Sequence, residues 1–197
     1  MALQPAKPLN FIRSALGEQA SGAVVAKPDR LLIPLEDVEY GRFNLIGRYV
    51  GDNQFMAFVT GAFPADWWSG NRPPEYLRNE WAKHKRWYAV LHRFGPDGTH
   101  LETEAWNGGT TADGQGQAID RADKKLAEFL ESLGPRPPSD IWVKPFGVEV
   151  DGYYFGLEYQ LNNYDDPANP DATYECVMLE PNDIMFHPPW DSGEYST

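Results

Sequence analysis

Residues 113–134 have the sequence DGQGQAIDRADKKLAEFLESLG, along which apolar side chains recur at intervals of three and four residues. The recurring side chains are Ala118, Ile119, Ala122, Leu126, Phe129, Leu130 and Leu133. This spacing puts them on one face of an α-helix, so the stretch predicts a long amphipathic helix. Thr111 or Asp113 has a side chain that can cap its beginning, and Gly134 followed by Pro135 predicts its end. We expect this helix to pack across a sheet.

Short stretches of alternating apolar and polar residues lie on both sides of the helix, with turn residues between them. Three pairs of stretches predict β-hairpins: residues 42–50 with 54–61, 87–94 with 99–106, and 141–150 with 153–161. Residues 31–35 and 173–180 predict further strands, and residues 75–84 predict a short helix. Tight turns join antiparallel strands, whereas parallel strands need longer crossovers. The fold class is therefore α+β, with a mostly antiparallel sheet built from hairpins.

The first 29 residues differ in composition from the rest of the chain. They contain Pro5, Pro8 and Pro28 among small residues, with only brief apolar groupings. This composition predicts a flexible or loosely packed N-terminal arm. Residues 30–197 are enough for one hydrophobic core and predict a single α+β domain.

The chain is strongly acidic, with a formal net charge of −12 at pH 7. Such a charge repels polyanions, which argues against nucleic acid or an anionic membrane as a partner and favours a basic protein. No run approaches the roughly 20 apolar residues that a membrane span requires. Cys176 is the single cysteine, so an intrachain disulfide is excluded and a reducing compartment is favoured. We expect a cytoplasmic protein without a cofactor or a bound metal.

One cluster has the residue types of a catalytic site. His100, Glu102 and Glu104 are spaced by two on the predicted strand 99–106, so ideal alternation puts all three on one face. With His92 on the facing strand, they could perform acid–base chemistry or bind a divalent metal, as in a hydrolase. The competing interpretation is the solvated face of a half-buried strand, which antiparallel sheets commonly have.

Tryptophans with acidic neighbours occur in two segments rich in turn residues. The candidate binding residues in these segments are Asp66, Trp67, Trp68, Trp190, Asp191 and Glu194. An exposed indole there could stack on a ligand or anchor a protein partner, with the carboxylates as polar contacts. The competing interpretation is that both segments fold back and cover the ends of the core, because tryptophan is highly buried on average.

Motifs of the common enzyme classes are absent from the sequence, including GxSxG, HExxH and paired CxxC. The sequence therefore favours a non-enzymatic protein that binds a protein partner through an acidic, tryptophan-containing surface. An inhibitor or immunity-type role against a basic partner fits the charge. The alternatives are a hydrolase using the 99–106 strand and a carbohydrate-binding module. The sequence predicts neither the identity of the partner nor the oligomeric state.

Overall fold

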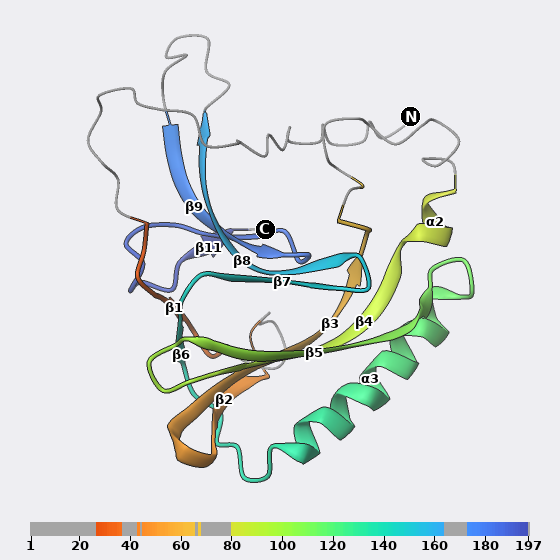
Figure 1. Ribbon diagram of the computed structural model, residues 1–197, viewed down its shortest axis with the longest axis horizontal. Coiled ribbons are helices and arrows are strands. Elements are labelled where there is room, and N and C mark those ends of the chain that lie inside the picture. The colour runs from red at the N-terminus through yellow and green to blue at the C-terminus, as the bar shows by residue number, and fades with distance from the viewer. Residues whose placement is uncertain are drawn as a thin grey trace.

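Antiparallel strands dominate the structure, a computed structural model that describes residues 27–36, 43, 45–65, 67, 80–163 and 173–196. Within these ranges the strands form a four-stranded, a five-stranded and a two-stranded sheet (Figure 1). The elements are β1 (Leu31–Ile33), β2 (Ile46–Tyr49), η1 (Val50–Asp52), β3 (Asn53–Ala62), α2 (Trp81–His84), β4 (Arg86–Phe94), β5 (His100–Thr110), α3 (Gln115–Ser132), β6 (Ile141–Val143), β7 (Phe146–Val150), β8 (Tyr153–Asn163), β9 (Thr173–Glu180), β10 (Ile184–Phe186) and β11 (Tyr195–Ser196). The predicted α+β class is confirmed.

The four-stranded sheet has the order β2-β3-β4-β5, and the long helix α3 packs on one of its faces (Figure 1). The apolar face of α3 contacts alternate residues of the two central strands, which confirms the predicted packing. These core residues are Phe55, Ala57, Ala89 and Leu91 from the sheet, and Ala122, Leu126, Phe129, Leu130 and Leu133 from the helical stretch. Close approach depends on Gly108 in β5, because a Cβ there would collide with the backbone oxygen of Ala118.

The sequence predicts the C-terminal end of α3 correctly but not the residue that caps its N-terminal end. Gly134 has a φ of +70°, the left-handed conformation expected just after a helix C-terminus. At the other end, the N-cap residue is Gly114, and no side chain caps the helix. The predicted caps, Thr111 and Asp113, are therefore wrong. Asp113 instead accepts hydrogen bonds from the backbone and the hydroxyl of Thr110, which close the turn before the helix.

The five-stranded sheet has the order β11-β10-β9-β8-β7 and packs on the other face of the four-stranded sheet. Alternate residues again supply the contact. Met56 and Phe94 from the four-stranded sheet join Leu157 and Leu179 from β8 and β9 in one core cluster. The hydrophobic core thus has two layers, one between the sheets and one beneath α3.

The third predicted hairpin is correct in its turn but wrong in its first strand. Asp151 and Gly152 both have positive φ angles and join β7 to β8, as predicted. The sequence predicts one strand over residues 141–150, but two strands form, separated by Lys144 and Pro145. Pro145 lacks a backbone N–H and cannot continue a ladder. β6 therefore does not join β7 in the five-stranded sheet, and it pairs with β1 in a separate two-stranded sheet.

Gln54, in β3, links this separate ribbon to the four-stranded sheet. Its side chain is fully buried and has three hydrogen bonds. Its amide nitrogen donates to the carbonyls of Gly95 and Trp142, and its oxygen accepts from the Trp142 backbone N–H. A buried amide is stable only when its polar atoms have partners, and here they do.

The remaining predicted elements are only partly covered. The helix predicted at 75–84 is seen as α2, which covers residues 81–84, while residues 75–79 lie outside the described residues. The predicted arm, residues 1–29, also lies outside them except for its last three positions. Within the described ranges, none of the helices combines the length and the apolar character that a membrane crossing needs.

Candidate functional site

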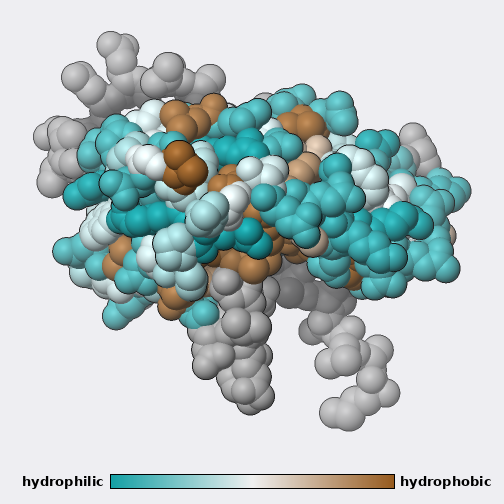
Figure 2. All heavy atoms as spheres, turned by 90° about the horizontal axis from the view of Figure 1, so that it is seen from below, coloured by the Kyte–Doolittle hydropathy of each residue, from teal (hydrophilic) through white to brown (hydrophobic). Residues whose placement is uncertain are grey.

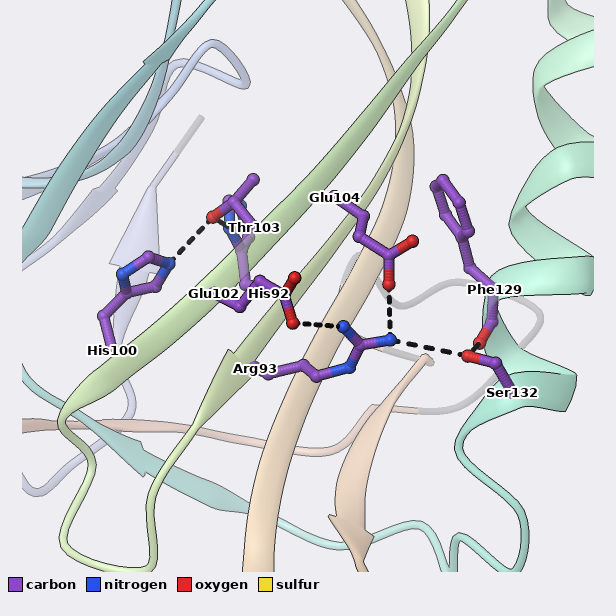
Figure 3. A network of polar contacts seen from close by, with 8 residues as sticks. All are labelled: His92, Arg93, His100, Glu102, Thr103, Glu104, Phe129 and Ser132. Carbon is purple, nitrogen blue, oxygen red and sulfur yellow. Dashed lines mark hydrogen bonds and ion pairs between the residues drawn. The ribbon is translucent and has the colours of Figure 1, made fainter.

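The predicted cluster of His100, Glu102 and Glu104 is divided between two faces of β5 (Figure 3). Phe94 pairs with His100 and Arg93 pairs with Glu102, so β5 has one residue more than β4 at this point. Such a bulge reverses the alternation of side chains. The prediction of one shared face is therefore wrong. His100 faces the five-stranded sheet, whereas both glutamates lie on the face that carries α3.

The two glutamates form ion pairs with a single arginine. Arg93 contacts Glu102 at 2.7 Å and also contacts Glu104, and it donates a longer hydrogen bond of 3.4 Å to Ser132 of α3 (Figure 3). Its side chain is only 17% exposed. The group thus connects β4, β5 and the helix. Because Arg93 engages both carboxylates, the arrangement is suited to holding elements together rather than to transferring protons.

On the other face, the Thr103 hydroxyl bridges two histidines. His92 Nδ1 lies 2.7 Å from the Thr103 Oγ1 atom, and His100 Nε2 lies 2.8 Å from the same oxygen (Figure 3). The His100 ring stacks on Phe146 of β7, with a centroid distance of 4.4 Å and an interplanar angle of 7°. His92 is fully buried, and its Nε2 atom has no hydrogen-bond partner.

The single hydroxyl proton of Thr103 orders this chain of hydrogen bonds. It can be donated to one imidazole only, so the other imidazole must donate to the hydroxyl oxygen. If His92 Nδ1–H donates, the isolated Nε2 atom is left as a bare acceptor instead of a buried unpaired N–H, which is the less costly arrangement. Thr103 then donates to His100 Nε2.

Burial disfavours the charged form of both histidines. Burial, with a smaller contribution from the neighbouring His100, lowers the pKa of His92 to about 3. Burial also lowers the pKa of His100, against the opposing effects of the Glu102 backbone and carboxylate. A general base must reach its substrate, and His92 is fully enclosed. Among the described residues, no group of three or more potential ligands is placed to hold a metal ion.

The first tryptophan segment is seen at one position. Trp67 is only 7% exposed, and its ring stacks on Phe63 at 4.9 Å and contacts His84 at 5.1 Å. For this residue the structure agrees with the interpretation of a core-covering tryptophan. Asp66 and Trp68 lie outside the described residues.

The second tryptophan segment is partly exposed. Trp190 packs against the main core cluster and makes an edge contact with Tyr159 at 6.5 Å. Its carbonyl accepts a hydrogen bond from the Leu32 backbone, which ties the segment to β1. Asp191 and Glu194 are exposed. Trp190 is thus anchored through its ring and backbone, and the carboxylates of Asp191 and Glu194 follow it in the sequence.

Three further carboxylates were not singled out from the sequence. Glu158 and Glu180 lie on neighbouring strands, and Asp183 follows in the turn after β9. Burial raises the pKa of Glu180 to about 7, with smaller contributions from Asp183 and Glu158. The signal that could have found them is the charge of each segment, which the net charge of the whole chain conceals.

Comparison with protein-family models, with curated proteins and with solved structures finds no match.

Proposed function

We propose that this chain is a non-enzymatic binding protein that presents an acidic surface to a basic protein partner. The observation that carries the proposal is the distribution of charge along the chain. Residues 145–197 contain eleven of the 29 acidic side chains and none of the 17 lysines and arginines. The preceding 144 residues contain 18 acidic and 17 basic side chains, which nearly balance.

The five-stranded sheet is built entirely from the acidic segment. We call the described part of that segment, residues 146–163 and 173–196, the acidic layer. Its exposed carboxylates are those of Glu149, Asp151, Glu158, Asp183, Asp191 and Glu194. Glu149 and Glu158 alternate along the strands with core residues such as Leu157, so they lie on the face of the sheet opposite the core.

Carboxylates of the acidic layer form no direct ion pair among the described residues, although Lys85 and Arg86 interact electrostatically with Asp183 and Asp151 over longer distances. The ion pairs there join Lys83 to Glu80, Arg93 to Glu102 and Glu104, Lys125 to Glu128, and Lys144 to Asp97. All lie before residue 145. Like charges without direct ion pairs repel one another, and a basic partner would relieve that repulsion while steering association. An inhibitor or immunity-type role would use this property.

Hydrophobic surface gives less support for a binding site than charge does. The face seen in Figure 2 is largely hydrophilic, and its hydrophobic residues form separate groups.

The two alternative functions, a hydrolase and a carbohydrate-binding module, have less structural support. A hydrolase would need His92 to be accessible and His100 to share a face with Glu102, and neither holds. A carbohydrate site could not use Trp67 as a stacking platform, because Trp67 is buried.

Two charge variants test the proposal. The first, E149Q/E158Q/E194Q, removes three exposed carboxylates from the acidic layer. The second, D120N/D123N/E131Q, removes three exposed carboxylates from α3 and so has the same net charge. Binding of cytochrome c and of polylysine, both basic probes, would be measured at several salt concentrations by isothermal titration calorimetry.

We expect the wild type to bind both probes at low salt and to release them as salt is added, because exposed charges are screened. The acidic-layer variant should bind about tenfold more weakly, since each exposed ion pair contributes about 0.2–1 kcal/mol. The α3 variant should retain nearly all of its affinity. Equal losses in the two variants, or no binding by the wild type, would contradict the proposal.

A further inference from the structure

β5 is the longest edge strand in the part of the chain that the structure describes. It ends the four-stranded sheet and spans eleven residues. The opposite edge, β2, has four residues and is covered, because Gly47 bridges to Pro138 and the Arg48 backbone donates to the Pro137 carbonyl. No described strand pairs with the free side of β5.

Residues 102–107 form a regular run within this edge. They pair without interruption with β4, between one bulge near Phe94 and a second near Tyr88. In an antiparallel pair, every second residue of an edge strand turns its N–H and C=O away from its neighbour. The run therefore presents a short row of backbone donors and acceptors that match an added strand.

The side chains along this run have an acidic and an aromatic character. Glu102, Glu104 and Trp106 pair with helix-facing residues of β4 and so share the face that carries α3. The Glu102 side chain is 59% exposed, and Trp106 is 37% exposed. Arg93 supplies one positive charge to two carboxylates, which leaves one negative charge in excess. A second cation on the free side of β5 would balance it.

We propose that the free edge of β5 binds an extended basic segment of the partner as a fifth strand. Backbone hydrogen bonds to residues 102–107 hold the segment, and a lysine or arginine on it pairs with Glu102 and Glu104. The exposed ring of Trp106 packs on the aliphatic part or the charge of a neighbouring basic side chain. The basic character of the partner rests on the proposed function, whereas the docking by strand addition is independent of it.

Bulges and charges on an edge strand also limit uncontrolled pairing. Here the bulges lie at the two ends of the regular run, so they restrict its length without interrupting it. The edge is thereby suited to a short segment of about six residues and not to a long strand.

A pair of peptides tests strand addition directly. The probe is a six-residue peptide in which lysine alternates with valine. Its control has the same sequence and charge, with alternate backbone nitrogens methylated, so it cannot complete a ladder. Hydrogen exchange of the ¹⁵N-labelled full-length chain would be followed by NMR, free and with each peptide.

In the free chain, we expect alternate amides of residues 102–107 to exchange quickly. The unmethylated peptide should slow those amides at least tenfold, and the methylated peptide should bind at least tenfold more weakly without slowing them. E102Q/E104Q should weaken binding of the unmethylated peptide, whereas E149Q/E158Q/E194Q should leave the slowed exchange at β5 in place.

If both peptides bind equally and exchange at β5 is unchanged, strand addition is excluded while binding to a basic partner stands. Unchanged exchange at β5 with the unmethylated peptide at millimolar concentration overturns the inference in any case. Slow exchange of these amides in the free chain would also overturn it, because another segment or a second copy would then occupy the edge.

Discussion

The molecule has two halves: the four-stranded sheet together with α3, and the acidic layer. Their charged side chains differ in how they are paired. In the first half, Arg93 pairs with two carboxylates and Lys125 pairs with Glu128. In the second half, the described carboxylates form no direct ion pair, and burial raises the pKa of one of them, Glu180, to about 7. The first half pairs most of its charge internally and has the properties of a scaffold, apart from the one excess negative charge beside Arg93. The second retains charge that folding alone does not require.

The largest expected effect is on packing in the scaffold half. Leu126 is 5% exposed and packs between α3 and the sheet. Leu126→Ala should lower the free energy of unfolding by about 2–5 kcal/mol, because it removes buried methyl groups and leaves a cavity. Urea denaturation would measure this change. The exposed substitution Glu158→Gln in the acidic layer should not lower stability, and a comparable loss there would break the contrast between the halves.

The second effect is a loss of stability in acid caused by His92. Its pKa is about 3 in the folded protein against a reference value of 6.5, so the folded state resists protonation. The stabilisation is complete above pH 6.5 and is lost as the pH falls toward 3. At pH 4.5 the loss should be about 2–3 kcal/mol. His92→Phe should flatten this dependence in denaturation series at pH 7.5, 6.0 and 4.5, whereas parallel curves would contradict the assignment.

Glu180 should show the opposite dependence on pH. Because its pKa is raised from 4.5 to about 7, the folded state favours the protonated acid. The stability of the folded state that this shift contributes is fully present below pH 4.5, and it is lost as the pH rises through 7. Glu180→Gln should therefore stabilise the protein by about 2 kcal/mol at pH 8 and have little effect at pH 4.5. Thermal unfolding at the two pH values measures this, and stabilisation confined to pH 4.5 would reverse our interpretation.

The smallest expected effect is the loss of the Arg93 ion pairs. Arg93→Met should cost about 1 kcal/mol, since the carboxylates are partly exposed and solvent weakens the pairs. Adding E102Q/E104Q should recover part of that loss by removing repulsion between the carboxylates. Lys125→Met breaks a pair on the helix surface and should cost less than about 0.5 kcal/mol in the same urea titration. No recovery in the combined variant would show that repulsion between Glu102 and Glu104 does not contribute to the loss.

Much of the fold could be predicted because local patterns coincide with tertiary contacts. The interval of three and four residues in 113–134 placed the buried face of α3 correctly, and Gly134 marked its end. The strand 141–150 was wrong because Pro145 changed the pairing partner of Ile141–Val143. Alternation alone does not tell which strand a segment pairs with.

The candidate site was harder to predict for two physical reasons. Alternation placed His100 with Glu102, but the bulge beside Phe94 reverses the phase, and a bulge has no clear signature in this sequence. Composition also could not distinguish an exposed tryptophan from Trp67, which is buried under Phe63. The charge of residues 145–197 was present in the sequence but was averaged with the balanced remainder.

The most direct test of the central claim is the position at which a basic partner binds. A titration of the ¹⁵N-labelled chain with polylysine at low salt, followed by NMR, would map the perturbed backbone amides. We predict that the perturbations concentrate in residues 146–163 and 173–196, together with the free edge of β5, and that they disappear as salt is added. Perturbations centred on the exposed face of α3, or spread evenly over the chain, would contradict the claim that the acidic layer is the binding surface.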